Sequence, residues 1–313
     1  MKAVLNGLQG IRLTCGKAAA FICPSLGANC LSLRIGEHVL LREPPHADIT
    51  PELANVYGMP FLFPPNRVAG GVYHFEGREY RFPINEPARG NHIHGFLSST
   101  EFEVVSVSEN EAVLRYQAAK PGAYLDFPHA FTVVREWKLN KDGLYTRLTV
   151  TNDSDQNMPV GVGFHTALNV CFTEDQEPAN YRLRMAAGEE IVYHPETIIP
   201  TGERRRGTEL LNALGGEGVC PQGERISRHM TCMPGGAEMV HLPSGKRMKY
   251  QISDTLPYWM LWNGDAQSGF ICPEPQSWIV DAPNQSQKTE ESGFRFITPG
   301  KAFVTEMALT LEA

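Results

Sequence analysis

The chain has 313 residues and a formal net charge of −7 at pH 7, so it lacks the basic character that nucleic-acid or anionic-membrane partners require. Its hydrophobic fraction of 42% and charged fraction of 20% are those of a globular protein with a large core. Seven cysteines without a C-x-x-C pair predict reduced thiols, not a disulfide framework or a zinc ribbon. The N-terminus lacks the apolar stretch of a signal peptide, and no segment has transmembrane length, which predicts a cytoplasmic protein.

Short β-rich runs separated by turn residues dominate the chain. We expect three hairpins, formed by residues 31–35 with 39–41, 102–107 with 112–116, and 131–139 with 144–150. Residues 303–311 predict a last strand with one apolar face. Strands that pair with their sequence neighbours favour antiparallel sheets.

Helical signals are few. Residues 50–56 predict a turn or two, capped by Thr50 with Pro51 at a tolerated first position, and residues 209–214 predict another short helix. No repeat, low-complexity tract or linker divides the chain. We therefore predict an all-β fold, a large antiparallel β-sandwich, formed by residues 1–313 as a single domain.

Common cofactor and nucleophile motifs are missing from the sequence. There is no glycine-rich phosphate loop between a strand and a helix, no G-x-S-x-G elbow and no H-E-x-x-H. The sequence therefore predicts a protein without a nucleotide cofactor or a metal, and it gives no support to a serine hydrolase or a zinc protease.

The first unusual segment is a Pro- and Gly-framed loop at 64–71, followed by N-H-I-H-G-F at 91–96. Arg67, next to Asn66, can be held rigidly there and offers several donors to sugar hydroxyls, although a solvated surface arginine is the alternative interpretation. His92 and His94 share one face of an extended segment. Without a nearby acidic ligand they predict a metal site only weakly.

Two further segments carry candidate acid–base groups. Residues 161–169 place His165 at the end of an apolar run, where a hydrogen-bonded core histidine is the alternative interpretation. Residues 270–278 place Glu274 between two prolines after an apolar strand, which suits a strand that ends at a cleft. Nearby tryptophans, among them Trp262, could raise the pKa of the carboxyl or stack on a sugar ring. The alternative is an edge-strand glutamate that faces water.

Taken together, the ordered motifs resemble the aldose 1-epimerases, or galactose mutarotases. The motifs are N-R-V-A-G at 66–70, aromatic-G-x-x-Y at 75–80, Asn85, I-H-G at 93–95, H-x-x-x-N at 165–169, E-T-x-I-P-T-G-E at 196–203 and C-x-E-P at 272–275. The resemblance runs from about Leu31 to the C-terminus. It implies a large antiparallel β-sandwich, no cofactor, and a monosaccharide substrate such as an aldohexose.

The resemblance also implies roles for residues. Glu274 matches the catalytic base, His165 the catalytic acid, His94 the second active-site histidine, and Arg67 the arginine that binds sugar hydroxyls. Such a pair interconverts anomers by moving protons at the C1 hydroxyl and the ring oxygen.

Besides Arg67, the predicted substrate-binding residues are Asn66, His92, Trp262 and His229. Whether His92 or His94 faces the site stays open, because a shift of one residue exchanges them.

Three departures from the family pattern concern the substrate. H-P-Y-F-N reads H-T-A-L-N at 165–169, H-G-G reads H-G-F at 94–96, and residues 226–230 lack the aspartate that grips sugar hydroxyls in many members. We therefore expect aldose 1-epimerase activity on a free aldose, with the sugar itself open.

Two alternatives remain. A hexose-6-phosphate 1-epimerase would need a cationic pocket, for which Arg67, Arg81, Arg89 and residues 204–206 are candidates. A non-catalytic sugar-binding protein on the same fold would not need both Glu274 and His165. The sequence leaves the choice between a monomer and a homodimer open.

Overall fold

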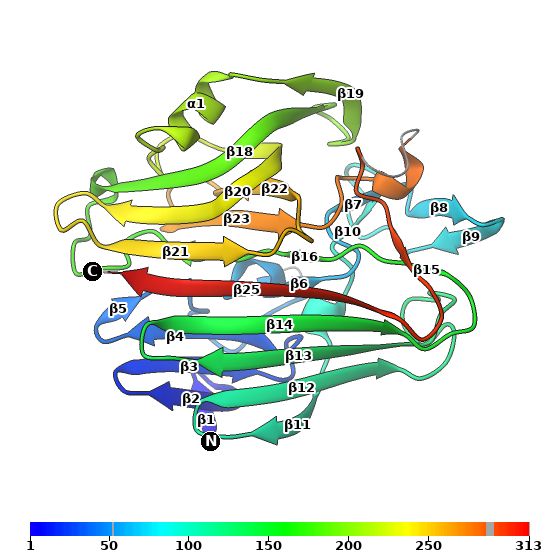
Figure 1. Ribbon diagram of the computed structural model, residues 1–313, viewed down its shortest axis with the longest axis horizontal. Coiled ribbons are helices and arrows are strands. Elements are labelled where there is room, and N and C mark those ends of the chain that lie inside the picture. The colour runs from blue at the N-terminus through cyan, green and yellow to red at the C-terminus, as the bar shows by residue number, and fades with distance from the viewer. Residues whose placement is uncertain (52, 286–290, 313) are drawn as a thin grey trace.

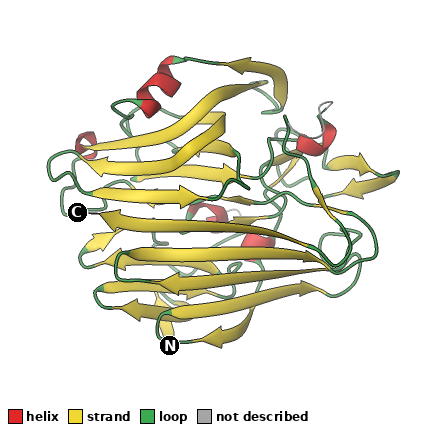
Figure 2. Ribbon diagram, viewed as in Figure 1, coloured by secondary structure: helices red, strands yellow, loops and turns green. Residues whose placement is uncertain are grey.

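The computed structural model describes residues 1–51, 53–285 and 291–312. Strands dominate it, and the helices are short (Figure 2). Within the described residues, no helix combines the length and the apolar character needed to cross a membrane.

A 14-stranded antiparallel sheet forms the body of the molecule (Figure 1). Its main path runs in the order β11 (Glu103–Val107), β12 (Glu111–Ala118), β13 (Phe131–Leu139), β14 (Gly143–Asn152), β25 (Ala302–Glu312), β21 (Arg247–Ile252), β20 (Ser227–His241), β22 (Tyr258–Trp262), β23 (Phe270–Gln276), β16 (Gly163–Phe164) and β6 (Phe61–Leu62). Off this path, β17 (Leu168–Asn169) pairs with β23, β18 (Tyr181–Tyr193) pairs with β20, and β19 (Pro200–Arg205) pairs with β18.

A five-stranded sheet packs against the β12–β14 part of the large sheet, which makes the sandwich. It consists of β1 (Lys2–Leu5), β2 (Leu8–Cys15), β3 (Ala18–Cys23), β4 (Asn29–Ile35) and β5 (His38–Val39). Three two-stranded pairs complete the strands: β7 (Arg67–Ala69) with β10 (Asn91–Ile93), β8 (Val72–Phe75) with β9 (Arg78–Arg81), and β15 (Met158–Pro159) with β24 (Phe296–Ile297). The all-β antiparallel sandwich predicted from the sequence is confirmed.

The three predicted hairpins are present as β4–β5, β11–β12 and β13–β14, and β25 covers the predicted last strand. The helix predicted at 209–214 is α1 (Glu209–Gly215), whose Thr208 side chain accepts a hydrogen bond from Leu211 N. In the segment 50–56 only a 3₁₀ turn forms, η1 (Leu53–Val56), and residue 52 lies outside the described residues. Further 3₁₀ turns are η2 (Leu97–Ser99), η3 (Pro178–Asn180) and η4 (Ala282–Asn284).

A buried arginine between the two sheets holds the backbone at residues 59–60, which in turn bonds the backbone of His165. Arg135 on β13 is fully buried, lies 4.2 Å from the ring of Trp137, and donates to the backbone oxygen of Met59 at 2.6 Å. The next residue, Pro60, accepts a hydrogen bond from His165 N at 3.1 Å. The position of His165 is thus tied to the core of the sandwich through the backbone at 59–60.

Candidate active site

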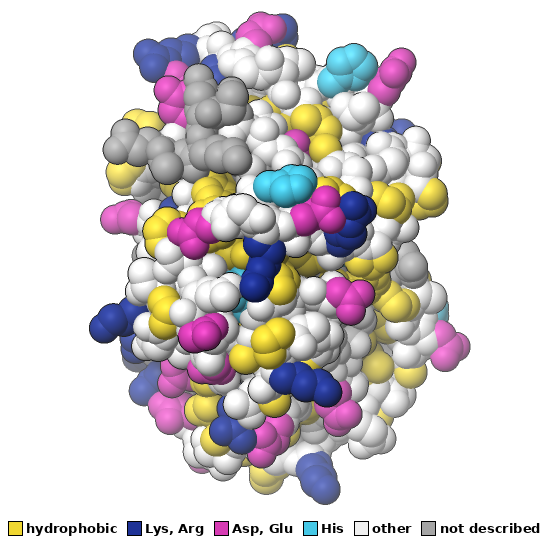
Figure 3. All heavy atoms as spheres, turned by 90° about the vertical axis from the view of Figure 1, so that its right-hand side faces the viewer, with side chains coloured by type: hydrophobic (Ala, Val, Ile, Leu, Met, Phe, Trp, Pro, Cys, Tyr) yellow, Lys and Arg dark blue, Asp and Glu magenta, His cyan; other side chains and the backbone are white. Residues whose placement is uncertain are grey.

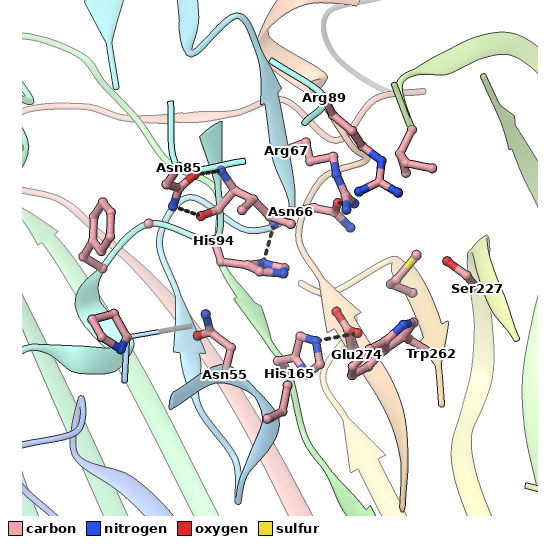
Figure 4. A pocket seen from close by; sticks show the side chains of 17 residues that line it. Asn55, Asn66, Arg67, Asn85, Arg89, His94, His165, Ser227, Trp262 and Glu274 are labelled. Atoms are coloured by element: carbon pink, nitrogen blue, oxygen red, sulfur yellow. Dashed lines mark hydrogen bonds and ion pairs between the residues drawn. The ribbon is translucent and has the colours of Figure 1, made fainter. Parts of the chain in front are cut away.

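A cavity of about 410 Å³ opens at one end of the large sheet, a size ordinary for a small-molecule site. Its walls come from β23, the chain after β16, the β7–β10 pair, and the loop before β19. Its polar lining residues include Asn66, Arg67, His94, His165 and Glu274, five residues that the sequence analysis selected (Figure 4).

His165 and Glu274 contact each other directly, with 3.1 Å between Nε2 and Oε1, and their side chains are 7% and 2% exposed. Burial raises the pKa of Glu274 well above its usual range, and the charge of Arg67 offsets this only partly. Burial also lowers the pKa of His165 to about 4. Both shifts in pKa favour the uncharged forms, a carboxylic acid beside a neutral imidazole.

His94 lies beside this pair, with its ring edge-on to that of His165 at 5.4 Å between centroids. The Nδ1 atom of His94 accepts a hydrogen bond from Asn66 N at 3.3 Å, so in the neutral ring the proton is on Nε2. Burial, and then the neighbouring His165 and Arg67, lower the pKa of His94 well below its usual range. His94 is thus a neutral hydrogen-bond donor.

The backbone around His94 and Asn66 takes a shape that few residues adopt. Both residues have positive φ, 65° and 56°, and His94 N donates to Asn66 O at 2.9 Å. Gly95 follows with φ of 63°, and a Cβ there would lie 1.9 Å from Phe63 O. The amide of Asn85 holds the same segment by hydrogen bonds to both backbone groups of Ile93, at 2.7 and 2.8 Å. These contacts aim the His94 ring at the cavity.

A carboxylate behind the wall orients two guanidinium groups. Glu86 accepts from Nε and Nη2 of Arg67 at 2.7 and 2.8 Å, from Arg89 at 2.9 Å and from Asn91 at 3.2 Å. Burial opposes ionisation of Glu86, but its hydrogen bonds to Arg67 and the charge of that residue lower its pKa. Arg67 also donates to Asn66 Oδ1 at 3.2 Å. All three donor nitrogens of Arg67 therefore have partners.

A second polar chain leads from Asn66 to the carboxyl group. Gln276, fully buried, accepts from Asn66 Nδ2 at 3.4 Å and donates to Glu274 Oε2 at 3.4 Å. Gln276 and Glu86 are functional neighbours that the sequence analysis missed. The signal for Gln276 was available, because residues two apart on a strand share a face with Glu274.

The remaining predicted binding residues divide into two groups. Trp262 lines the cavity with its ring 5.4 Å from that of His165, at 75°. His92 does not line the cavity, since its buried ring stacks on Phe82 at 4.9 Å and its Nδ1 bonds Pro83 O. The structure thus places His94, and not His92, in the cavity.

His229 is also buried outside the cavity lining, one strand beyond Met260, which is paired with Glu274 across β22 and β23. Met260 itself lines the cavity, as does Ser227 at the start of β20. The rest of the lining is mixed. It includes the apolar side chains of Val56, Ile93, Phe96, Ile198 and Trp262 and the polar side chains of Asn55, Asn85 and Arg89.

Of the arginines considered for a cationic pocket, Arg67 and Arg89 line the cavity. Arg81 pairs with Glu79 on the surface, and Arg204 to Arg206 pair with Glu189 and Glu203. On the face drawn in Figure 3, acidic and basic side chains are interspersed, without a contiguous basic surface. Among the described residues no group of three or more His, Cys, Asp or Glu side chains is placed to hold a metal ion.

Comparison with known proteins is consistent with this geometry. The family model described as "Aldose 1-epimerase" matches residues 9–309. The uncharacterized protein YphB of Escherichia coli (strain K12) is 31% identical over 254 residues, covering 79% of this chain and 81% of YphB. The uncharacterized protein YihR of the same bacterium is 28% identical over 199 residues, which cover 61% of this chain and 62% of YihR, less than two thirds of its length.

Two solved structures share the fold. A galactose mutarotase-like protein from Clostridium acetobutylicum is 26% identical, with a TM-score of 0.92 over 100% of this chain and 98% of that one. A GalM/aldose epimerase homologue from C. elegans is 17% identical, with a TM-score of 0.76 over 100% of this chain and 99% of that one, a likeness of fold alone.

Proposed function

Because the chain belongs to the aldose 1-epimerase family, we propose that it interconverts the α and β anomers of an aldose by acid–base ring opening and reclosure. The observation that carries this proposal is the 3.1 Å contact between His165 and Glu274 in the cavity. The two oxygens that exchange protons, O1 and the ring oxygen, are bonded to the same carbon and lie close together. An acid and a base must therefore also lie close together.

The reaction begins with a proton transfer inside the pair. Movement of the carboxyl proton of Glu274 to Nε2 of His165 produces a carboxylate base and an imidazolium acid. Glu274 then takes the proton of the C1 hydroxyl while His165 protonates the ring oxygen, and the C1–ring-oxygen bond breaks to leave an aldehyde. After rotation about C1–C2, the reverse transfers close the ring on the other face and return both groups to their starting state.

The neighbouring residues assist without exchanging protons. His94 donates from Nε2 to an oxygen at C1, since Asn66 holds its Nδ1 as an acceptor. Gln276 donates to Oε2 of Glu274, while Oε1 of Glu274 faces Nε2 of His165. The charge of Arg67 stabilises the ionised form of Glu274, which burial alone disfavours. Trp262 offers an apolar ring beside the sugar.

The test is the anomerisation rate of freshly dissolved α-anomers, followed by polarimetry with and without the purified protein. We expect decay to the equilibrium rotation to be faster than the spontaneous rate, in proportion to protein concentration. If the protein binds sugars, as shown by calorimetry, but accelerates none of them, it is a binding protein and the proposal is wrong.

A further inference from the structure

The cavity carries more positive charge than a site for a neutral sugar needs. Its lining contains two guanidinium groups, Arg67 and Arg89, and one carboxyl group, Glu274. Glu86 lies behind the wall and is shared by both arginines. One carboxylate between two guanidinium groups leaves a net positive charge at this wall of the cavity.

Arg89 is the less occupied of the two guanidinium groups. Arg67 uses Nε and Nη2 on Glu86 and Nη1 on Asn66. Arg89 uses Nη1 alone, on Glu86, and its Nε and Nη2 have no hydrogen-bond partner among the described residues. Figure 4 shows its guanidinium beside that of Arg67 at the cavity. Two donors in a fixed plane match the two oxygens of a carboxylate or a phosphate.

Arg89 also lies away from the reacting pair. The charge of Arg67 partly offsets the raised pKa of Glu274, whereas the charge of Arg89 lowers the pKa of Glu86. In Figure 4 both arginines lie on the side of the cavity opposite His165. A sugar whose C1 lies against the His165–Glu274 pair therefore directs a remote part of its ring or side chain toward Arg89.

Acidic side chains that would repel an anion are few in the cavity. Among the described residues that line it, Glu274 is the one acidic side chain, and it lies beside His165. Ser227, which also lines the cavity, is uncharged. A single carboxyl group and a guanidinium with free donors together favour an anion over a cation in this cavity.

We propose that the substrate is an aldose with an anionic group, a carboxylate or a phosphate ester, remote from C1, and that Arg89 binds this group. The proposal rests on the epimerase function proposed above and adds the substrate class. Arg67 keeps one further N–H on each of Nη1 and Nη2 for sugar hydroxyls, and its charge acts on Glu274, whereas Arg89 binds the anion.

The experiment compares neutral and anionic sugars of the same configuration. Anomer exchange is measured by proton NMR for glucose, glucuronate and glucose 6-phosphate, and for the three corresponding galactose sugars, with the protein-free rate of each sugar subtracted. We expect kcat/KM to be at least about tenfold higher for one anionic sugar than for its neutral counterpart. Preference for the uronate or for the phosphate identifies the anion.

Two variants assign the effect to one residue. Arg89→Gln should lower kcat/KM for the preferred anionic sugar by roughly 10- to 100-fold, chiefly through KM, and lower the value for the neutral sugar much less. The matched control is Arg81→Gln, which removes an arginine that is 70% exposed and paired with Glu79 outside the cavity, and which should change neither rate. High salt should weaken the reaction of the anionic sugar alone.

The outcomes separate the two proposals. If neutral sugars react as well as both anionic ones, or if Arg89→Gln lowers all rates equally, the epimerase function stands and the anionic substrate class is wrong. If none of the six sugars is accelerated, the epimerase function itself is contradicted, and the substrate class with it.

Discussion

The contacts of Glu86 with Arg67 and Arg89 behind the cavity allow a quantitative prediction of the free energy of unfolding. In the variant Glu86→Gln, the guanidinium groups of Arg67 and Arg89 lose the carboxylate that they share. The wild-type carboxylate accepts hydrogen bonds at 2.7, 2.8, 2.9 and 3.2 Å, and the side chains of Arg67 and Glu86 are 13% and 14% exposed. A hydrogen bond to a charged group is worth about 1.5–3 kcal/mol, and removing one partner of a buried ion pair costs about 3–5 kcal/mol.

Glutamine keeps one acceptor oxygen and the volume of the side chain, so part of this network survives. We therefore expect Glu86→Gln to lower the free energy of unfolding by about 2–4 kcal/mol. We also expect KM for the sugar to rise more than kcat falls, because Arg67 loses the group that orients it. Urea denaturation followed by tryptophan fluorescence measures the first effect, and anomerisation kinetics measure the second.

The control is Glu79→Gln, in which the carboxylate also contacts an arginine, Arg81, at 2.6 Å. There the side chains are 39% and 70% exposed, so solvent screens the pair and the expected loss is below about 1 kcal/mol. Equal and small losses in the two variants would refute the reasoning, because they would show that burial of Glu86 adds nothing.

Three further predictions concern backbone shape and buried histidines. Gly95→Ala should lower the free energy of unfolding by more than about 3 kcal/mol, because the new Cβ would lie 1.9 Å from a backbone oxygen. Gly70 has a similar φ and open space around its Cα, so Gly70→Ala should lower it by about 1–2 kcal/mol. Urea denaturation compares the two variants. Burial lowers the pKa of His92 and His129 to about 4 in the folded protein, whereas in the unfolded chain these histidines take up protons near pH 6.5. The free energy of unfolding should therefore fall as pH drops from about 6.5 to about 4, by up to about 3 kcal/mol for each histidine. Denaturation at a series of pH values measures this loss. His229→Leu removes a buried ring whose two nitrogens have no hydrogen-bond partner among the described residues, so the free energy of unfolding at pH 7 should be kept or raised. A loss above about 1 kcal/mol in the same assay would contradict this.

The strands were predictable where local patterns suffice. Residues 131–150 alternate apolar and polar side chains around a turn, and β13 and β14 follow that pattern. The pairing of β25 with β14 and β21 could not be predicted, because it joins parts of the chain that are distant in sequence. The alternation also gave no warning of Arg135, which occupies a core-facing position of β13, where backbone oxygens of Gly27 and Met59 accept from its Nη1 and Nη2.

The sequence was sufficient to select the residues of the site, but not to predict which of them contact one another. The proline bracket and the family motifs selected Glu274, and the H-x-x-x-N motif selected His165. Their direct contact depends on β23 and the chain after β16 lying side by side, which neither motif states. The choice between His92 and His94 depended on a left-handed residue just after β10, a conformation that the sequence does not reveal.

The most direct test of the central claim is the anomerisation rate of Glu274→Gln beside the wild type, on whichever aldose the wild type accelerates. Glutamine preserves the shape of the side chain but cannot take the proton of the C1 hydroxyl. We expect kcat to fall by about 10²–10⁴-fold, while sugar binding, measured by calorimetry, and the denaturation midpoint are retained. A variant that binds sugar and keeps full activity would contradict the assignment of Glu274 as the base.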